Sequence, residues 1–145
     1  MAEKHGETET VEQFLDSTLD SVDSAEETAV RVAGKAGIEE DELHKIAMAV
    51  RECMVNAVVH GNRYNARKKV HLFVSTNSGR FTVKIADEGE GFDLENLPDP
   101  LAPENLLRNS GRGIFLIRAF MDEVDIRRRE PHGIEVTLVK NLVSK

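Results

Sequence analysis

Residues 45–61, KIAMAVRECMVNAVVHG, decide the fold because they set regularly spaced polar residues into a strongly apolar helical pattern. Glu52, Asn56 and His60 stand four positions apart, and side chains at that spacing lie close to one face of an α-helix. The residues around them are apolar, so this helix is suited to a protein core. A carboxylate and a carboxamide on such a helix indicate a covered polar site.

The patterns on either side of this helix predict one α+β domain with a two-layer α/β sandwich. Helices are expected on one face of a mixed, mostly antiparallel sheet. Residues 1–10 are expected to form a flexible tail and residues 11–145 the domain. The polar, proline-containing segment 94–109 is expected to form a functional lid. The other expected elements are a strand over 11–19, a helix from the capping box Ser24–Glu27 to a stop at Gly37, a helix from 39–42 to near Gly61, a β-hairpin of strands 70–74 and 81–85 with the turn TNSG at 76–79, a helix over 114–121, and strands over 124–128 and 133–139.

The composition limits the classes of function. The 145 residues carry a net charge of −7, which argues against direct nucleic-acid binding, and the triplet Arg127–Arg129 is typical of solvated charge at a strand end. No apolar run has the length of a membrane span, and the polar N-terminus lacks the apolar core of a signal peptide. The lone Cys53 excludes an intrachain disulfide and indicates a buried thiol in a reducing compartment. These features predict a cytoplasmic protein without membrane association.

Two glycine motifs follow the hairpin and precede the next helix. Asp87-x-Gly89-x-Gly91 ends an apolar strand, where two glycines permit close approach of the backbone to a flat ligand and an aspartate could accept a hydrogen bond from an amine such as that of adenine. Gly111-x-Gly113 stands directly before a helix, where unhindered N–H groups and the helix dipole favour phosphates. Each motif also fits a simpler structure, a glycine-rich turn in the first case and a tight loop-to-helix turn in the second.

Glu52 and Asn56 fit the same kind of site. The Asn56 carbonyl oxygen is a suitable Mg²⁺ ligand, and Glu52 can accept a proton from a hydroxyl nucleophile or from water. The alternative is the polar face of a half-exposed helix, but the apolar surroundings favour a covered, functional face. A histidine at a helix end, such as His60, is more often a structural cap than a ligand.

Taken in order, Glu52-x-x-x-Asn56, Asp87-x-Gly89-x-Gly91 and Gly111-x-Gly113 resemble the nucleotide-binding motifs of the GHKL ATPase superfamily, which includes gyrase, histidine kinases and MutL. More closely, the chain resembles the small anti-sigma-factor serine/threonine kinases of the RsbW type. The resemblance runs through AVRECMVNAVVHGN, DEGEGFD and SGRGIFLIRAFMDEV, and it covers nearly the whole chain from about residue 11.

This resemblance implies a Bergerat-type fold that binds ATP and Mg²⁺ beneath a lid. It implies that Asn56 coordinates Mg²⁺ and that Glu52 is the general base. It further implies that Asp87, Gly89 and Gly91 form the adenine pocket, and that Ser110, Gly111 and Gly113 lie at the phosphates. The implied partners are a STAS-domain anti-anti-sigma factor, phosphorylated on serine or threonine, a sigma factor, and a second copy of the chain in a homodimer.

The sequence departs from the family pattern at two places. Relatives often have a threonine pair after the glycine of the last strand, whereas Gly133 is followed here by Ile134 and Glu135. Some relatives carry an arginine directly before Ser-Gly-x-Gly, whereas Asn109 takes that position here, so no catalytic arginine is assigned.

Three other hypotheses remain open from the sequence. The first is a GHKL-fold binding module that sequesters a partner without phosphoryl transfer; Glu52 favours the kinase and the altered last strand favours the module. The second is the catalytic half of a histidine kinase, although the roughly 50 residues before the Glu52 motif already belong to the ATP domain. The third is an unrelated α+β domain with coincidental glycines.

Overall fold

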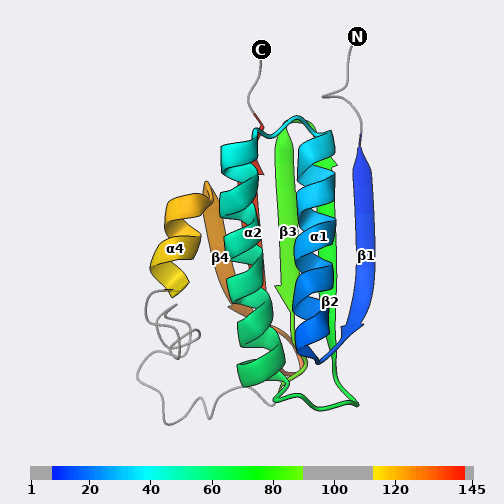
Figure 1. The fold of residues 1–145 in the computed structure, drawn as a ribbon. Helices are drawn as coiled ribbons and strands as arrows, with labels where there is room; N and C mark the ends of the chain where they lie inside the picture. The colour runs from blue at the N-terminus through cyan, green and yellow to red at the C-terminus, as the bar shows by residue number, and fades with distance from the viewer. Residues whose placement is uncertain (1–7, 90–112, 143–145) are drawn as a thin grey trace.

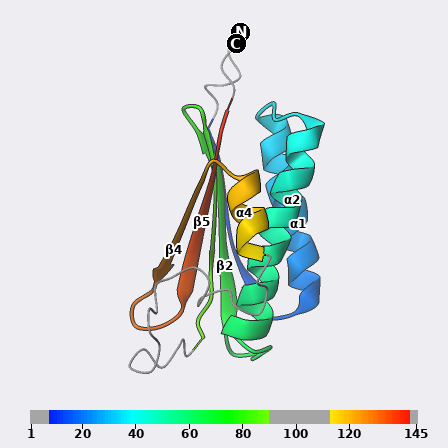
Figure 2. The same ribbon diagram turned by 90° about the vertical axis from the view of Figure 1, so that its left-hand side faces the viewer.

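The computed structural model describes residues 8–89 and 113–142, which form two layers. A five-stranded sheet makes one layer, and the helices make the other (Figures 1 and 2). The elements in chain order are β1 (Glu9–Asp16), α1 (Leu19–Lys35), α2 (Glu40–Val55), the π-helical turn η2 (Asn56–Gly61), β2 (Lys69–Asn77), β3 (Arg80–Ala86), α4 (Gly113–Phe120), β4 (Glu123–Arg128) and β5 (Ile134–Asn141).

The sheet has the strand order β1-β2-β3-β5-β4, and each neighbouring pair is antiparallel. Figure 2 shows α1, α2 and α4 on the same side of this sheet. The predicted α+β sandwich with helices on one face is therefore confirmed, and no pairing among the described strands is parallel. None of the helices within residues 8–89 and 113–142 has the length and apolar character needed to cross a membrane.

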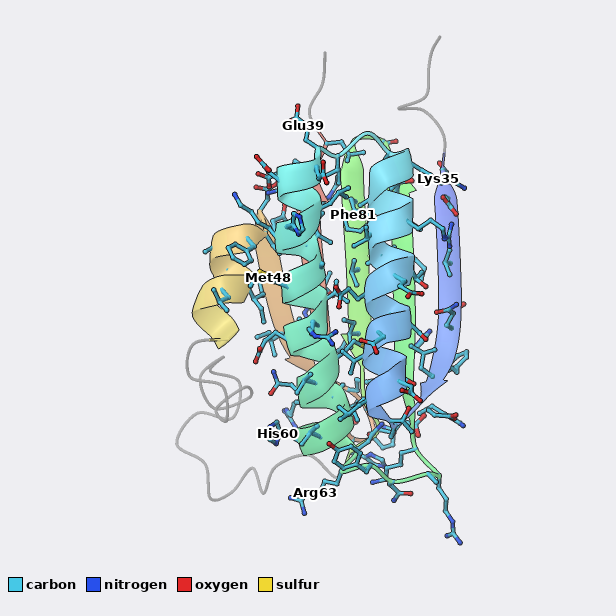
Figure 3. All side chains as sticks on the ribbon, in the orientation of Figure 1. Lys35, Glu39, Met48, His60, Arg63 and Phe81 are labelled. Carbon is cyan, nitrogen blue, oxygen red and sulfur yellow. The ribbon has the colours of Figure 1, made fainter. Side chains whose placement is uncertain are left out.

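The core lies between the sheet and the two long helices. Alternate residues of the central strands point towards the helices, as the two-residue period of a strand requires. Phe81 on β3 is fully buried in this layer, where Figure 3 shows it behind α1 and α2. The remaining strand residues of the core include Val70, Leu72, Val74, Val83, Ile85, Val136 and Leu138. The helices contribute Ala25, Ala29, Val32, Ala33, Ile46, Ala49, Val50, Cys53 and Met54.

The first helix begins earlier than its capping-box motif predicts. Thr18 has an extended backbone and is the N-cap, and the Ser21 N–H donates to its carbonyl oxygen at 3.1 Å. Ser24 is therefore a helix-interior residue, and the predicted helix start there is wrong. Val22 is buried, so the apolar stripe extends one turn before Ser24, and the burial of this turn outweighs a local motif worth about 1 kcal/mol. The predicted stop is confirmed, because Gly37 has a φ of +94°.

The second helix runs without interruption to Gly61, as predicted, but its last turn changes period. The Asn62 N–H donates to the carbonyl oxygen of Ala57, five residues back, at 2.8 Å. Such π-helical turns are rare and occur often at functional sites. Asn56 at the start of this turn is buried, whereas His60 is exposed at the helix end (Figure 3), so the covered part of the polar stripe ends before His60.

The remaining predicted elements are confirmed within the described residues, except that β1 covers Glu9–Asp16 rather than the predicted 11–19, because Leu19 already begins α1. β2 and β3 form the predicted hairpin, and Ser78 and Gly79 have φ values of +49° and +85°, as a tight hairpin turn requires. α4 follows Gly113, and β4 and β5 close the sheet. The predicted lid over 94–109 lies outside the described residues.

Candidate functional site

The candidate site lies where the end of the second helix meets the end of β3. Gly61, the last residue of η2, lies directly against the side chain of Asp87, which follows β3. Figure 1 shows that α2 and β3 run towards the same end of the molecule. The two predicted motifs, one on the helix and one after the strand, are therefore adjacent in the fold.

Asp87 is a buried carboxylate with an ordered set of partners. Its side-chain Oδ1 accepts hydrogen bonds from the backbone N–H groups of Gly89 at 2.9 Å and Ile134 at 3.3 Å. Among the described residues, no donor lies on Oδ2. Only 5% of the residue is exposed, and this burial raises the pKa of Asp87, while the two N–H donors and then the positive charge of Arg129 act to lower it. Within residues 8–89 and 113–142, Oδ2 is therefore the carboxyl oxygen of Asp87 without a hydrogen-bond donor.

Three glycines surround this carboxyl group and have no room for a side chain. A Cβ on Gly61 would lie 2.5 Å from Cγ of Asp87, and one on Gly89 would lie 2.7 Å from the carbonyl carbon of Gly61. A Cβ on Gly133 would collide with the carbonyl oxygen of Asp87. Contacts this short do not occur for ordinary Cβ atoms, so glycine is required at each position. Only Gly89 of the three was predicted as a site residue.

Glu52 and Asn56 form a connected pair on the same helix. Nδ2 of Asn56 donates to the Glu52 carbonyl oxygen at 2.9 Å and to Oε2 of the Glu52 carboxylate at 3.3 Å. Asn56 is buried and Glu52 is half-buried, as the sequence indicates for a covered polar stripe. Because both bonds use the amide nitrogen, the Asn56 oxygen has no partner among the described residues.

Asn62 ties the helix end to the neighbouring strands. This residue is only 2% exposed; its Nδ2 donates to Oγ of Ser17 at 2.9 Å and to the carbonyl oxygen of Lys69 at 3.0 Å, and its Oδ1 accepts from the Glu88 N–H at 2.7 Å. The segments before α1, at the start of β2 and after β3 are thus all bonded to the buried Asn62 amide at the end of η2. Sequence reasoning missed Asn62, although a polar residue directly after a helix-terminal glycine is a local signal for such a connector.

The phosphate side of the predicted site is described only in part. Gly113 begins α4, and this helix packs against α2 (Figure 1). Gly91, Ser110 and Gly111 lie outside the described residues. No cluster of three or more histidine, cysteine, aspartate or glutamate side chains suited to a metal is found in residues 8–89 and 113–142.

The basic triplet at the end of β4 is only partly solvated, whereas the sequence favoured solvated charge at all three positions. Arg127 and Arg128 are exposed, but Arg129 is half-buried, and its Nη1 donates to the carbonyl oxygen of Asp87 at 3.0 Å. Sequence reasoning missed this contact because 42 residues separate the two positions. Cys53 is 1% exposed, and burial raises the pKa of its thiol, which confirms the predicted buried thiol.

Comparisons with known proteins agree with this geometry. The histidine kinase-like ATPase domain family matches residues 15–140. The chain is 30% identical to "Serine-protein kinase RsbW" of Staphylococcus epidermidis over 137 residues, which cover 90% of this chain and 85% of that protein. It is 37% identical to "Anti-sigma F factor" of Bacillus subtilis over 106 residues, which cover 70% of this chain and 71% of that protein.

A solved structure gives an independent comparison of the fold. The RsbU and RsbW domains of a Mycobacterium tuberculosis protein match with a TM-score of 0.67 and 16% sequence identity. The match covers 94% of this chain and 33% of that chain, so this chain spans a third of that longer protein. At this identity the match establishes the fold alone.

Proposed function

The chain belongs to the histidine kinase-like ATPase domain family, and on that premise we propose that it is an ATP-dependent protein-serine/threonine kinase that also acts as an anti-sigma factor. The two activities are those named in its relatives, which are 28–37% identical over 70–93% of this chain. The observation that carries the nucleotide-binding half of the proposal is the buried Asp87 carboxyl group within its glycine cradle. We further propose that residues 9–145 act as one domain; the predicted tail over 1–10 is too long by two residues, because β1 begins at Glu9, which pairs with Thr76 of β2.

The cradle supports binding of adenine. The glycines let the backbone pack closely around Asp87 and so hold its carboxyl group in place, and the 6-amino group of adenine is a suitable donor for Oδ2, to which no described residue donates. Gly89 shapes one wall of this pocket, and Gly91 is proposed to extend it.

The Glu52–Asn56 pair supports a magnesium-assisted phosphate site. The Asn56 oxygen is a hard, neutral ligand of the kind that Mg²⁺ accepts, and its amide is oriented by the two bonds to Glu52. Since no cluster of acidic ligands is found in the described residues, the ion fits as one held by a single side chain together with substrate phosphates. A bound Mg²⁺ would neutralise charge that develops on the phosphates.

Glu52 is the proposed general base. The hydroxyl oxygen of the substrate serine or threonine attacks the γ-phosphorus of ATP, its proton passes to the Glu52 carboxylate, and ADP leaves with the electron pair of the broken P–O bond. Gly113 at the start of α4 and the preceding Ser110 and Gly111 are proposed to offer hydrogen-bond donors to the phosphates.

The proposed partners follow from the anti-sigma role. We propose that the phosphorylated protein is a STAS-domain anti-anti-sigma factor, that the second partner is a sigma factor, and that the chain forms a homodimer. Sigma factors act on RNA polymerase, so we place this partner switch in the cytoplasm, where the reduced, buried Cys53 is also expected.

Transfer of labelled phosphate from ATP to a candidate STAS protein tests the kinase proposal. Glu52→Gln should lower the transfer rate by about 10²- to 10⁴-fold, the usual contribution of a general base, and leave ATP affinity within about twofold. Glu40→Gln is the matched control, because Glu40 lies on the same helix and is exposed. Tight complex formation without any phosphate transfer by the wild-type protein would reject the kinase and leave a sequestering module.

A further inference from the structure

The turn between β4 and β5 makes two side-chain contacts with the segment that carries Asp87. Arg129 Nη1 donates to the carbonyl oxygen of Asp87 at 3.0 Å, and His132 Nδ1 is hydrogen-bonded to the carbonyl oxygen of Gly89 at 2.9 Å. A carbonyl oxygen only accepts, so Nδ1 of His132 carries the proton in this contact. We call these two residues the turn clip.

The turn clip acts where the regular sheet ladder stops. Ala86 is paired with Glu135, and the Asp87 N–H donates to the carbonyl oxygen of Ile134 at 3.0 Å. Beyond that point the carbonyl oxygens of Asp87 and Gly89 are held by side chains rather than by a neighbouring strand. The two bonds to alternate carbonyl groups fix the direction of the backbone through the Asp87 motif, since a buried carbonyl group needs a partner.

The turn itself is built to approach this segment closely. The Arg129 N–H donates to the carbonyl oxygen of Gly133 at 2.9 Å, which closes the turn. Gly133 has a φ of +109° and lies against the Asp87 carbonyl group, where a side chain would not fit. The backbone of the turn and both clip side chains therefore hold the same short segment.

Arg129 also acts on the charge of the site. Its guanidinium favours the ionised form of Asp87 and so lowers the pKa that burial of the carboxyl group raises. An ionised carboxylate is a stronger hydrogen-bond acceptor than a neutral carboxylic acid. Removing Arg129 would thus loosen the Asp87 segment and weaken Oδ2 as an acceptor.

We propose that Arg129 and His132 are positioning residues that set the selectivity of this site for a purine with a 6-amino group. The proposal rests on the proposed function, since it assumes that the site binds ATP. The two residues act through Asp87 and need no contact with the nucleotide. Arg129 takes no part in the proposed catalytic steps, so this positioning role is additional to them.

Selectivity between ATP and ITP tests this role directly. Inosine carries a carbonyl oxygen where adenine carries the 6-amino group, so ITP does not form the bond to Asp87. Dissociation constants of both nucleotides are measured with Mg²⁺ by calorimetry for the wild type, Arg129→Gln, Arg129→Lys and His132→Ala. Arg128→Gln is the control, because Arg128 is an exposed neighbour in the same triplet. Thermal melting of each variant checks that the fold is retained.

The expected result is a loss of selectivity rather than a uniform loss of binding. Arg129→Gln should lower the preference for ATP over ITP by about tenfold, the worth of one hydrogen bond to a charged group, while ITP binding changes little. Arg129→Lys should retain more of the preference for ATP than Arg129→Gln does. His132 is exposed, so His132→Ala should lower the preference by a smaller factor than Arg129→Gln. Arg128→Gln should retain the wild-type preference.

Three outcomes would overturn the inference, and they differ in what they say of the proposed function. If the wild type prefers ATP, and folded Arg129→Gln and His132→Ala retain that preference in full, the positioning role is rejected and the proposed function stands. If both variants lose ATP and ITP affinity equally, the clip is merely structural and the inference is again rejected. A wild-type protein that binds neither nucleotide overturns the proposed function and the inference with it.

Discussion

Gly61→Ala is the substitution that most directly tests the contact between the second helix and Asp87. The new Cβ would lie 2.5 Å from Cγ of Asp87, whereas carbon atoms in favourable contact are about 3.5–4.0 Å apart. Either the carboxyl group or the helix end must therefore move by about 1 Å. Displacements of this size in a binding site have large effects, because the ligand contacts are directional.

The magnitude follows from the bond that Asp87 is proposed to make with adenine. A hydrogen bond to a charged group contributes about 1.5–3 kcal/mol, so its loss should weaken ATP binding by about 10- to 150-fold. Overpacking costs about 1–3 kcal/mol, and alanine gains about 0.5–1 kcal/mol over glycine in a helix, so the variant should be destabilised by about 0.5–2 kcal/mol. The protein should stay folded while it loses affinity.

Calorimetric titration with Mg²⁺ and ATP measures the affinity, and urea unfolding measures the stability. Gly34→Ala is the matched control: Gly34 also lies in a helix, but a Cβ there would be 3.8 Å from the nearest side-chain atom, an ordinary contact. It should bind ATP like the wild type and be stabilised by about 0.5–1 kcal/mol. A folded Gly61→Ala protein with wild-type ATP affinity would refute the proposed role of Asp87.

Three further predictions concern other parts of the structure. Asn62→Ala removes three hydrogen bonds at a buried position and should lower the free energy of unfolding by about 2–4 kcal/mol in urea titration; a loss below 0.5 kcal/mol, within the range of ordinary surface substitutions, would contradict the role of Asn62 as a connector. Burial raises the pKa of Asp87, so the folded protein binds the proton of this carboxyl group more tightly than the unfolded chain does. The protonated group therefore contributes its full stability below the unfolded pKa of about 3.9, and this contribution is lost as the pH rises through the folded pKa. The wild type should therefore lose stability relative to Asp87→Asn from pH 4 towards neutrality without nucleotide, and a pH-independent difference would reject this. Cys53, whose buried thiol has a raised pKa, should react with a thiol reagent on the order of 100-fold more slowly in the native protein than in guanidinium; equal rates would show that α2 opens freely.

Elements with strong local periodicity could be predicted from the sequence. Apolar and polar residues alternate in β2 and β3 on either side of a recognisable turn, and the apolar stripe of α2 is long. The local preference of these segments therefore agrees with their tertiary packing. The capping-box motif failed as a helix start because the same residues also fit a helix interior, and burial of Val22 decides in favour of the longer helix. The π-helical turn over residues 56–61 could not be predicted, since the apolar periodicity of the sequence does not mark a change of helical period there.

The chemistry of the site was only partly visible in the sequence. Glu52, Asn56, Asp87 and Gly89 stand out because a polar residue or a glycine interrupts an apolar pattern. The partners of Asp87 in residues 129–134 carry no local signal, since their role comes from the pairing of β3 with β5. Long-range contacts of this kind are set by topology, which a periodic pattern does not encode.

The order of synthesis gives the turn clip a further consequence. During translation Asp87 leaves the ribosome before Arg129, His132 and Ile134, because these partners are encoded 42–47 residues later. A nascent chain that has emerged only as far as α4 lacks β5, the strand next to β3, and with it the donors that hold the Asp87 segment. The site proposed to bind ATP would thus be complete only once the whole sheet has been assembled, so a partly made chain would lack it.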